Sequence, residues 1–467
     1  MAIQRLVTLL LVPLVAACTA HFPVNEPLER HDPETGYRLK ELEKADDSKE
    51  LFLMLTFSGG GTRGAALAYG VLEELAKTEV VVEGQRRQLL DEVDVISSVS
   101  GGSFTAAYYG LFRDRIFEDF EERFLKKNIQ KALEGEFLRP DNWARLGSAG
   151  FSRSDLVAKY YDKHIFEGAT YADLEVRGEP QIVINATDIV LGTVFEFTQS
   201  YFDWICSDLS KLPVARAVAA SSAIPVFLTP IILHNYAGRC TFQPPEWFSE
   251  ALHSGAVAPH RFEEAKQRRT YLNVTERPYI QLMDGGLADN LGLRAPLDGA
   301  LLLGGLWSAL REFRLEGTRR IVVIAVNAEH EADTSWMRRE RAPKIEQVLG
   351  SLTAVSIRQA NSATLEIARR NFPRWREEVR TKRCAAQGRT PSVNRAAEAM
   401  AGACDDFETR LVEVNLDALL NVKERTYLKQ LPTSFHLQPE DVDRLRSAAA
   451  KLLAQSASFQ SFIKQLR

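Results

Sequence analysis

The chain has 467 residues, of which 45% are hydrophobic and 26% are charged, and its formal net charge at pH 7 is −4. This length and apolar content are typical of a globular protein with a full core, built as one large domain with additions or as two or three domains. Basic residues are scattered rather than clustered, so the electrostatic footprint of a nucleic-acid-binding protein is missing and no nucleic-acid partner is expected.

The first seventeen residues have the features of a targeting segment that is not part of the fold. Arg5 supplies a positive charge, and the apolar stretch 6–14 is too short to span a bilayer. The segment ends in Val15-Ala16-Ala17-Cys18, which resembles the lipobox of bacterial lipoproteins. That resemblance implies cleavage before Cys18, lipid attached to this cysteine, and a place in the cell envelope, with the outer membrane favoured. The alternative is a plain secretory signal in which small residues happen to precede a cysteine.

Four cysteines remain after the lipobox cysteine, and an even number in an exported chain is compatible with disulfides. We favour the pairs Cys206–Cys240 and Cys384–Cys404 among the three possible pairings, because each pair lies within one region of the chain. No cysteine and histidine spacing resembles a zinc site, so no metal is expected, and no cofactor motif is present.

Residues 18–50 are polar and proline-containing, and we expect them to form a tether. From residue 51 onward, strand and helix patterns alternate, which predicts an α/β fold with a central, mostly parallel sheet covered by helices. The expected strands are 51–57, 93–99, 181–187, 193–198, 229–233, 279–283, 321–326 and 411–416. The expected helices are 65–76, 101–112, 212–221, 296–303, 344–372 and 439–454.

Two stretches interrupt the alternation inside the main domain, which we place at residues 51–330. Residues 113–180 are charged and mostly helical in pattern, and residues 234–277 form a second long insertion. Long insertions in a compact domain are often lids or binding elements. Residues 331–467 are predicted to be a mainly helical extension, and no chemistry can be assigned to them from the sequence.

Three short motifs follow strand-like runs. They are Ser58-Gly59-Gly60-Gly61-Thr62-Arg63-Gly64, Ser98-Val99-Ser100-Gly101-Gly102-Ser103 and Asp284-Gly285-Gly286. Ligands of open α/β sheets gather at the carboxyl ends of strands, so the three motifs are expected to converge.

The second motif predicts a nucleophilic serine. Ser100 lies between a strand and a helix, where a sharp turn presents a hydroxyl at the N-terminus of the helix. Ser98 stands where the G-x-S-x-G pattern has its first glycine, and serine is small enough for the helix to pass close to the turn. Alone, this motif is compatible with an ordinary glycine-serine turn.

The other two motifs complete an acyl-transfer site. Gly59, Gly60 and Gly61 can turn their backbone N–H groups toward a developing oxyanion. A phosphate loop is the rival interpretation, but no lysine or magnesium-binding hydroxyl follows, so no nucleotide is expected. Asp284 is the candidate proton acceptor, and Asp289 and Asn290 are expected to be turn or helix-capping residues.

Together, the three motifs resemble the patatin-like phospholipase family, whose pattern is G-G-G-x-[RK]-G, then G-x-S-x-G, then D-G-[GA]. Residues 219–227, Ala-Ala-Ser-Ser-Ala-Ile-Pro-Val-Phe, also resemble the family's A-S-x-A-x-P-x-x-F segment. The resemblance covers roughly residues 51–326, and Ser98 is its main departure.

The resemblance implies a three-layer patatin-like fold and a lipid acyl hydrolase that needs no cofactor. It implies a Ser100–Asp284 dyad without histidine, in which Ser100 attacks a lipid ester and Asp284 accepts its proton. Arg63, followed by Gly64, matches the basic position of the family, where it either steadies the loop or receives an anionic head group.

Two other functions compete with this one. An α/β-hydrolase triad of Ser100, Asp284 and His330 has the chain order of that class. A non-catalytic envelope lipoprotein that binds acyl chains belongs to another class. As a membrane-contacting face or lid we consider residues 201–205 with Trp247 and Phe248, and ordinary core packing is the alternative.

Overall fold

The structure, a computed structural model of the chain, describes residues 25–39, 50–146, 151–225, 227–253, 255, 258–331, 338, 340, 343–389, 404 and 406–466. The expected targeting segment and Cys18 lie outside these residues. Within the described ranges, no helix has both the length and the apolar character that a membrane crossing requires.

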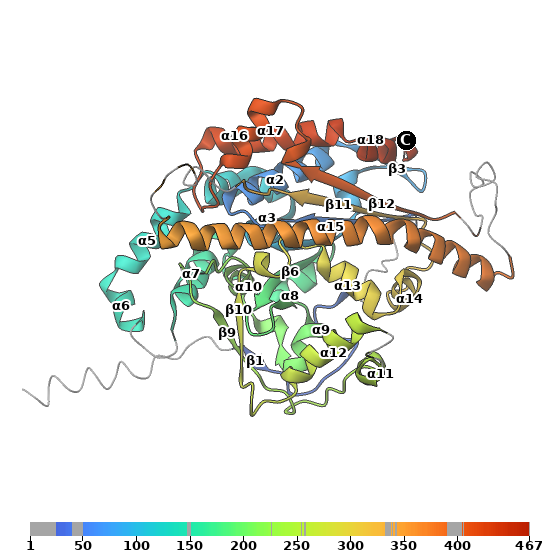
Figure 1. Cartoon of the computed structure of the whole chain (residues 1–467), viewed down its shortest axis with the longest axis horizontal. Helices are drawn as coiled ribbons and strands as arrows, with labels where there is room; N and C mark the ends of the chain where they lie inside the picture. Colours follow the sequence, from blue (N-terminus) through green and yellow to red (C-terminus); the bar gives the residue numbers. More distant parts are fainter. Residues whose placement is uncertain are drawn as a thin grey trace, which may run out of the picture.

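An eight-stranded mixed sheet forms the centre of the molecule (Figure 1). The strand order is β12-β11-β2-β5-β6-β10-β9, and β7 pairs with β6 beside this path. Neighbours from β12 to β6 are parallel, whereas β10, β9 and β7 pair antiparallel. The bounds are β2 Leu51–Phe57, β5 Val93–Val99, β6 Gln181–Asp188, β7 Thr193–Glu196, β9 Ile231–His234, β10 Tyr279–Met283, β11 Arg320–Asn327 and β12 Glu408–Asn415. The predicted α/β class with a mostly parallel central sheet is confirmed.

Helices cover both faces of the sheet, which explains why β2 and β11 are apolar at most positions. Leu53 and Leu55 of β2 belong to a core that includes α2 (Thr62–Lys77), α3 (Gly101–Phe112), α10 (Val214–Ser221) and α17 (Pro439–Gln455). Met54 belongs to a second core, with α13 (Arg294–Leu302), α14 (Leu306–Glu312) and α15 (Ile345–Ala386). Successive residues of β2 therefore serve opposite layers, as the alternation of a strand requires.

The two predicted insertions are largely helical. The first contains α4 Ile116–Phe120, α5 Ile129–Leu138, α6 Pro140–Leu146, α7 Arg153–Tyr161 and α8 Tyr171–Arg177, and the second contains α11 Glu246–His253 and α12 Pro259–Tyr271. The first insertion packs on α3 through aromatic rings. Phe104 of α3 lies 4.2 Å from Phe124 and 4.8 Å from Tyr161, measured between ring centroids.

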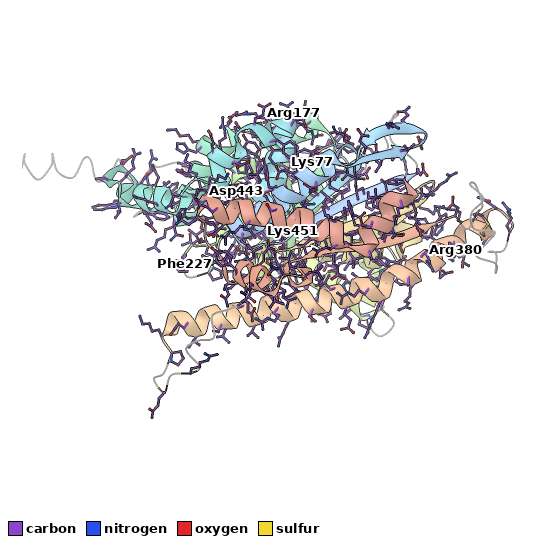
Figure 2. All side chains as sticks on the ribbon, turned by 90° about the horizontal axis from the view of Figure 1, so that it is seen from above. Lys77, Arg177, Phe227, Arg380, Asp443 and Lys451 are labelled. Carbon is purple, nitrogen blue, oxygen red and sulfur yellow. A yellow bond between two sulfur atoms is a disulfide. The ribbon has the colours of Figure 1, made fainter. Side chains whose placement is uncertain are left out.

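The C-terminal region, expected to be a mainly helical extension, contributes to the same body. Its strand β12 pairs with β11 over its whole length, and α15 crosses the molecule (Figure 1). It also contains α16 (Val422–Gln430) and α18 (Ala457–Gln465). From above, Figure 2 shows α17 with Asp443 and Lys451. This helix packs on α2, where Arg446 donates to Glu73 over 2.8 Å.

The helix predicted at 344–372 is longer than expected, because it continues through Pro373 to Ala386. Its last turn carries one end of a disulfide, Cys384–Cys404. The other disulfide joins Cys206 to Cys240. Both bonds have the pairing that the sequence favours.

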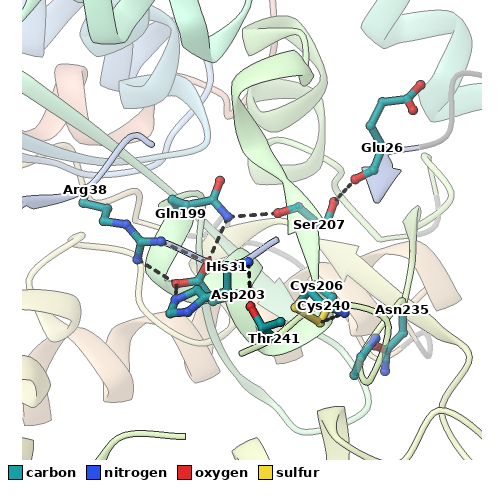
Figure 3. Close-up of a disulfide and its surroundings, with 11 residues drawn as sticks. Glu26, His31, Arg38, Gln199, Asp203, Cys206, Ser207, Asn235, Cys240 and Thr241 are labelled. Atoms are coloured by element: carbon teal, nitrogen blue, oxygen red, sulfur yellow. Dashed lines mark hydrogen bonds and ion pairs between the residues drawn. A yellow bond between two sulfur atoms is a disulfide. The ribbon is translucent and has the colours of Figure 1, made fainter. Parts of the chain in front are cut away.

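Part of the expected tether is folded onto the body next to the Cys206–Cys240 disulfide (Figure 3). There β1 (Glu26–Pro27) pairs with β8 (Ser207–Asp208), and Arg38 donates to Asp203 over 2.6 Å. Tyr37 is buried, and its hydroxyl accepts a hydrogen bond from the amide of Ile182. The polar composition of the segment therefore reflects specific polar contacts over residues 25–39.

Further short elements are β3 Glu79–Val82, β4 Gln85–Gln88 and α9 Gln199–Phe202.

Candidate active site

Ser100 occupies a sharp turn between β5 and α3. Its backbone angles, φ 48° and ψ −117°, lie where residues with a side chain are strained. Its amide donates to Ser221 Oγ over 2.8 Å, and Ser221 Oγ donates to the carbonyl of Asn185 over 2.6 Å. Such backbone strain persists only where contacts with the surrounding structure hold the residue in place, and strained residues cluster at functional sites.

The glycines after Ser100 permit a close approach of three backbone segments. A Cβ atom on Gly101 would lie 2.0 Å from the carbonyl oxygen of Gly61, and one on Gly102 would lie 2.7 Å from Phe57 Cβ. Both positions therefore require glycine. Ser98, which departs from the family pattern, is fully buried in β5 and donates from its Oγ to Val183 O over 3.2 Å. The sheet accommodates this hydroxyl without disturbing the turn.

The hydroxyl of Ser100 points at Asp284. Ser100 Oγ donates to Asp284 Oδ2 over 2.9 Å, and Asp284 Oδ1 accepts from the amide of Gly286 over 2.8 Å. Gly285 must lack a side chain, since a Cβ there would lie 2.4 Å from the carbonyl oxygen of Asn185. The backbone of Asp284 is fixed as well, because its carbonyl accepts from Thr187 Oγ1 and its amide donates to Ala223 O.

Asp284 reaches this place from the direction opposite to the other two motifs. Strand β10 is antiparallel to β6 and pairs with it only through Leu282 and Met283, opposite Asp188 and Thr187. The carboxyl end of β10 therefore overlaps the carboxyl end of β6, whose other neighbour β5 leads into Ser100. The three motifs converge as expected, although the third strand is not part of the parallel set.

Burial raises the pKa of Asp284 to about 6, against the smaller opposing effects of its bonds from Gly286 and Ser100. Removing a carboxylate from water disfavours its charged form. A carboxylate with a pKa near neutrality is a better proton acceptor than an ordinary aspartate, yet it is still ionised at neutral pH.

In the glycine loop, residues 58–61, the three predicted oxyanion donors differ in their hydrogen bonding. The amide of Gly59 donates to the carbonyl of Asn290 over 3.0 Å. This bond fixes the loop and leaves the Gly59 amide occupied. The amides of Gly60 and Gly61 have no hydrogen-bond acceptor in the part of the chain that the structure describes. Gly61 has φ 59°, and its carbonyl lies directly beside Gly101. The predicted oxyanion set therefore narrows to Gly60 and Gly61.

Arg63 is almost fully buried and holds the glycine loop in place. Its Nε donates to the carbonyl of Ala328 over 2.9 Å, and its Nη1 donates to the carbonyl of Leu431 over 2.5 Å. Burial lowers the pKa of the guanidinium to about 10. Of the two roles considered for Arg63, these contacts favour steadying the loop. Gly64 is equally confined, because a Cβ there would lie 2.8 Å from Gly59 O.

His330 is not a partner of the dyad. Its Nδ1 lies 3.0 Å from the carbonyl of Lys429, and desolvation lowers its pKa. The described partners of the Asp284 carboxylate are Ser100 Oγ and Gly286 N. Asp289 is a capping residue, as expected, since Oδ2 accepts from the amide of Arg294 at the start of α13.

The predicted membrane-contacting face at residues 201–205 with Trp247 and Phe248 is wrong. Trp204 is 2% exposed and packs against Phe248, with ring centroids 5.1 Å apart. Trp247 is partly buried, and the Arg268 guanidinium lies over its ring and that of Trp204. Core packing, the alternative interpretation, explains this cluster.

Two residues that position the site were not assigned this role from the sequence. Ser221 holds the Ser100 amide, and Asn290 holds the Gly59 amide through its carbonyl. Ser221 lies within the 219–227 segment that matches the family pattern, so a signal existed although no role could be attached to it. Among the described residues, no group of three or more His, Cys, Asp and Glu side chains could hold a metal ion.

Comparison with known proteins identifies a family for more than half of the chain. Residues 55–297 match the family described as patatin-like phospholipase. No curated protein matches the chain.

Among solved structures, human GIVD cytosolic phospholipase A2 is similar at 12% identity and a TM-score of 0.42, over 92% of this chain and 62% of that chain. VipD from Legionella pneumophila is similar at 10% identity and a TM-score of 0.27, over 94% of this chain and 73% of that chain. The chain thus spans about three fifths of the length of the human enzyme. The match over residues 55–297, which contains all three motifs, shows that the chain belongs to the patatin-like phospholipase family.

Proposed function

We propose that this protein is a membrane-anchored serine acyl hydrolase that cleaves the carboxylic esters of lipids through a Ser100–Asp284 dyad. The observation that carries the proposal is the 2.9 Å hydrogen bond from Ser100 Oγ to Asp284 Oδ2, beside the close approach of Gly61 to Gly101. The amides of Gly60 and Gly61 have no acceptor among the described residues. Membership of the patatin-like phospholipase family supports a lipid ester as the substrate.

In the first half-reaction, Asp284 accepts the proton of Ser100 as Oγ attacks the ester carbonyl carbon. The negative charge moves to the carbonyl oxygen, where the amides of Gly60 and Gly61 can donate to it. Collapse of the tetrahedral intermediate breaks the bond to the alcohol, and Asp284 returns its proton to that leaving oxygen. The product is an acyl-enzyme at Ser100.

In the second half-reaction, Asp284 accepts a proton from water, and the hydroxide oxygen attacks the acyl carbon. Collapse of the second intermediate releases the fatty acid and restores the proton to Ser100 Oγ. The same carboxylate thus serves as base and acid in turn, a cycle that its raised pKa of about 6 supports.

The proposed anchor is a lipid on Cys18, which would hold the enzyme at the outer membrane on the periplasmic side. The lipobox-like sequence supports this, and so do the two disulfides, which are typical of proteins in an oxidising compartment. Phospholipids or lysophospholipids of the same membrane are then the substrates at hand.

The test is a comparison of lipid products. Wild-type protein and the Ser100→Ala variant are each incubated with mixed membrane lipids, and the released fatty acids and lysolipids are identified by mass spectrometry. We expect free fatty acids with wild type and none above background with Ser100→Ala. Equal release by both proteins would contradict the proposal, and the identity of the lysolipids would give the head group and ester position.

A further inference from the structure

We propose that residues 431–435, here called the clamp segment, fix the glycine loop against α3, the helix that follows Ser100. Thr433 in this segment is a positioning residue for the oxyanion donors Gly60 and Gly61. The clamp segment is the first part of the connection between α16 and α17, and it lies outside the matched residues 55–297. The inference rests on the proposed function, because it concerns the same reaction.

The clamp segment binds the glycine loop at three points. Arg63 Nη1 donates to the carbonyl of Leu431 over 2.5 Å, and Arg63 Nη2 donates to Thr433 Oγ1 over 3.1 Å. The amide of Thr62 donates to the carbonyl of Ser434 over 2.9 Å. The loop therefore finds part of its hydrogen bonding about 370 residues further along the chain, where no sequence motif points to it.

The contacts continue directly to the proposed donors. A Cβ on Gly61 would lie 2.4 Å from the carbonyl oxygen of Ser434, and a Cβ on Gly60 would lie 3.2 Å from Arg63 Nη2. Gly61 is therefore packed between the clamp segment on one side and Gly101 on the other. A shift of the clamp segment would move the amides of Gly60 and Gly61.

The other end of the clamp segment is anchored on the helix that follows Ser100. Phe435 is 8% exposed, and its ring lies 5.6 Å from that of Phe104 in α3, measured between centroids. Its ring also contacts Phe124 and Tyr161, and its carbonyl accepts from the amide of Gln130. One short segment thus contacts both the loop that carries the proposed donors and the helix that follows the nucleophile.

This arrangement matters because oxyanion donors act only within a narrow range of distances, about 2.7–3.1 Å from the developing charge. Removal of one donor typically lowers kcat by about 10²–10³-fold. Loss of one hydrogen bond that positions the donors should have a smaller effect, and we expect roughly tenfold.

Thr433→Val is the principal variant, since it removes the hydroxyl that Arg63 contacts and keeps the shape of the side chain. Thr433 is exposed, so valine is tolerated there. Thr433→Ser, which keeps the hydroxyl, should restore the wild-type behaviour. Thr409→Val is the matched control, because Thr409 Oγ1 donates to Phe372 O over 2.8 Å in the same C-terminal region but at a different place.

Three measurements are made on the full chain: kcat and KM for a short soluble ester, the labelling rate of Ser100 by a fluorophosphonate, and hydrogen exchange of peptides that cover residues 58–66. For Thr433→Val we expect faster exchange in these peptides, a roughly tenfold lower kcat, slower labelling and a KM within about twofold of wild type. Thr433→Ser and Thr409→Val should match wild type in all three.

Wild-type kcat in Thr433→Val, or an equal loss in Thr409→Val, would overturn the inference. Failure of the proposed function looks different, because wild type itself would then neither hydrolyse the ester nor react with the fluorophosphonate. Even then, if hydrogen exchange at residues 58–66 were the same in Thr433→Val as in wild type, the proposed role of the clamp segment would be refuted. Phe435→Leu is a second test, because it weakens the packing of the clamp segment on α3. It should also lower kcat and slow the labelling of Ser100 while KM stays close to the wild-type value.

Discussion

The chemistry of Asp284 follows from where its carboxylate lies. Two hydrogen bonds satisfy its oxygens, yet burial dominates and raises its pKa to about 6. Ionised Asp284 can accept the proton of Ser100, whereas the protonated form cannot. The pH dependence of the reaction should therefore report this one side chain.

We expect kcat/KM for a short soluble ester to be constant above about pH 7 and to fall about tenfold per pH unit below about pH 6. The fall occurs on the acid side because lowering the pH through the pKa protonates the base. A pH series of initial rates measures the midpoint. A midpoint near 4, the value of an unperturbed aspartate, would contradict the role of burial.

A second buried carboxylate supplies the control for that profile. Burial also raises the pKa of Asp289 to about 6, but its oxygens cap the start of α13 and do not contact Ser100. Asp289→Asn should leave the midpoint of the profile unchanged, even if the protein becomes less stable.

His330 distinguishes a dyad from a triad. Its ring contacts the carbonyl of Lys429, so it has no direct part in proton transfer from Ser100. His330→Ala should keep kcat within about threefold of wild type, whereas loss of a true triad histidine typically costs several orders of magnitude. Steady-state kinetics with the short ester decides between the two.

At the scale of elements, the apolar runs and glycine motifs were enough to place β2, β5, β10 and β11 and the turns that follow them. The sequence could not show that β10 is antiparallel, because strand direction is set by the connections through α11 and α12. It also could not show the contacts of Arg63 with Leu431 and Thr433, which join positions 368 and 370 residues apart. Local patterns carry no information about such pairs.

The close approach of α3 to the glycine loop predicts the effect of a single methyl group. Gly101→Ala would place a Cβ 2.0 Å from Gly61 O, so the helix and the loop must separate. We expect kcat to fall at least about 100-fold, and the overpacking to cost about 1–3 kcal/mol of stability.

Gly135→Ala is the matched control for Gly101→Ala. Gly135 lies in α5 with nothing within 4 Å of the added Cβ, so alanine should stabilise the helix by about 0.5–1 kcal/mol and leave kcat unchanged. Equal kinetics for the two variants would show that the approach of Gly101 to Gly61 is not needed for activity.

For the whole molecule, the alternation of strands and helices was sufficient to predict the α/β class. Two features required the tertiary structure. The aromatic residues around Trp204 form a packed cluster with Arg268, although their composition resembles a membrane-contacting face. Residues 25–39 are polar enough for a tether, but Asn25, Tyr37 and Arg38 bind partners in the body.

The proposed anchor predicts where the full chain is found in the cell. Cys18→Ala removes the only group to which the lipid could attach in the lipobox-like sequence. The variant should move from the membrane fraction to the soluble periplasmic fraction, while its activity toward a short soluble ester stays the same. A variant that remains in the membrane fraction would show that another contact holds the protein there.

The most direct test of the account is the reaction of Ser100 with a fluorophosphonate, followed by mass spectrometry of the digested protein. We predict a single adduct on Ser100 in wild type, no adduct in Ser100→Ala, and labelling at least about 100-fold slower in Asp284→Asn, because the base is then missing. An adduct on another residue, or an unchanged rate in Asp284→Asn, would contradict the dyad.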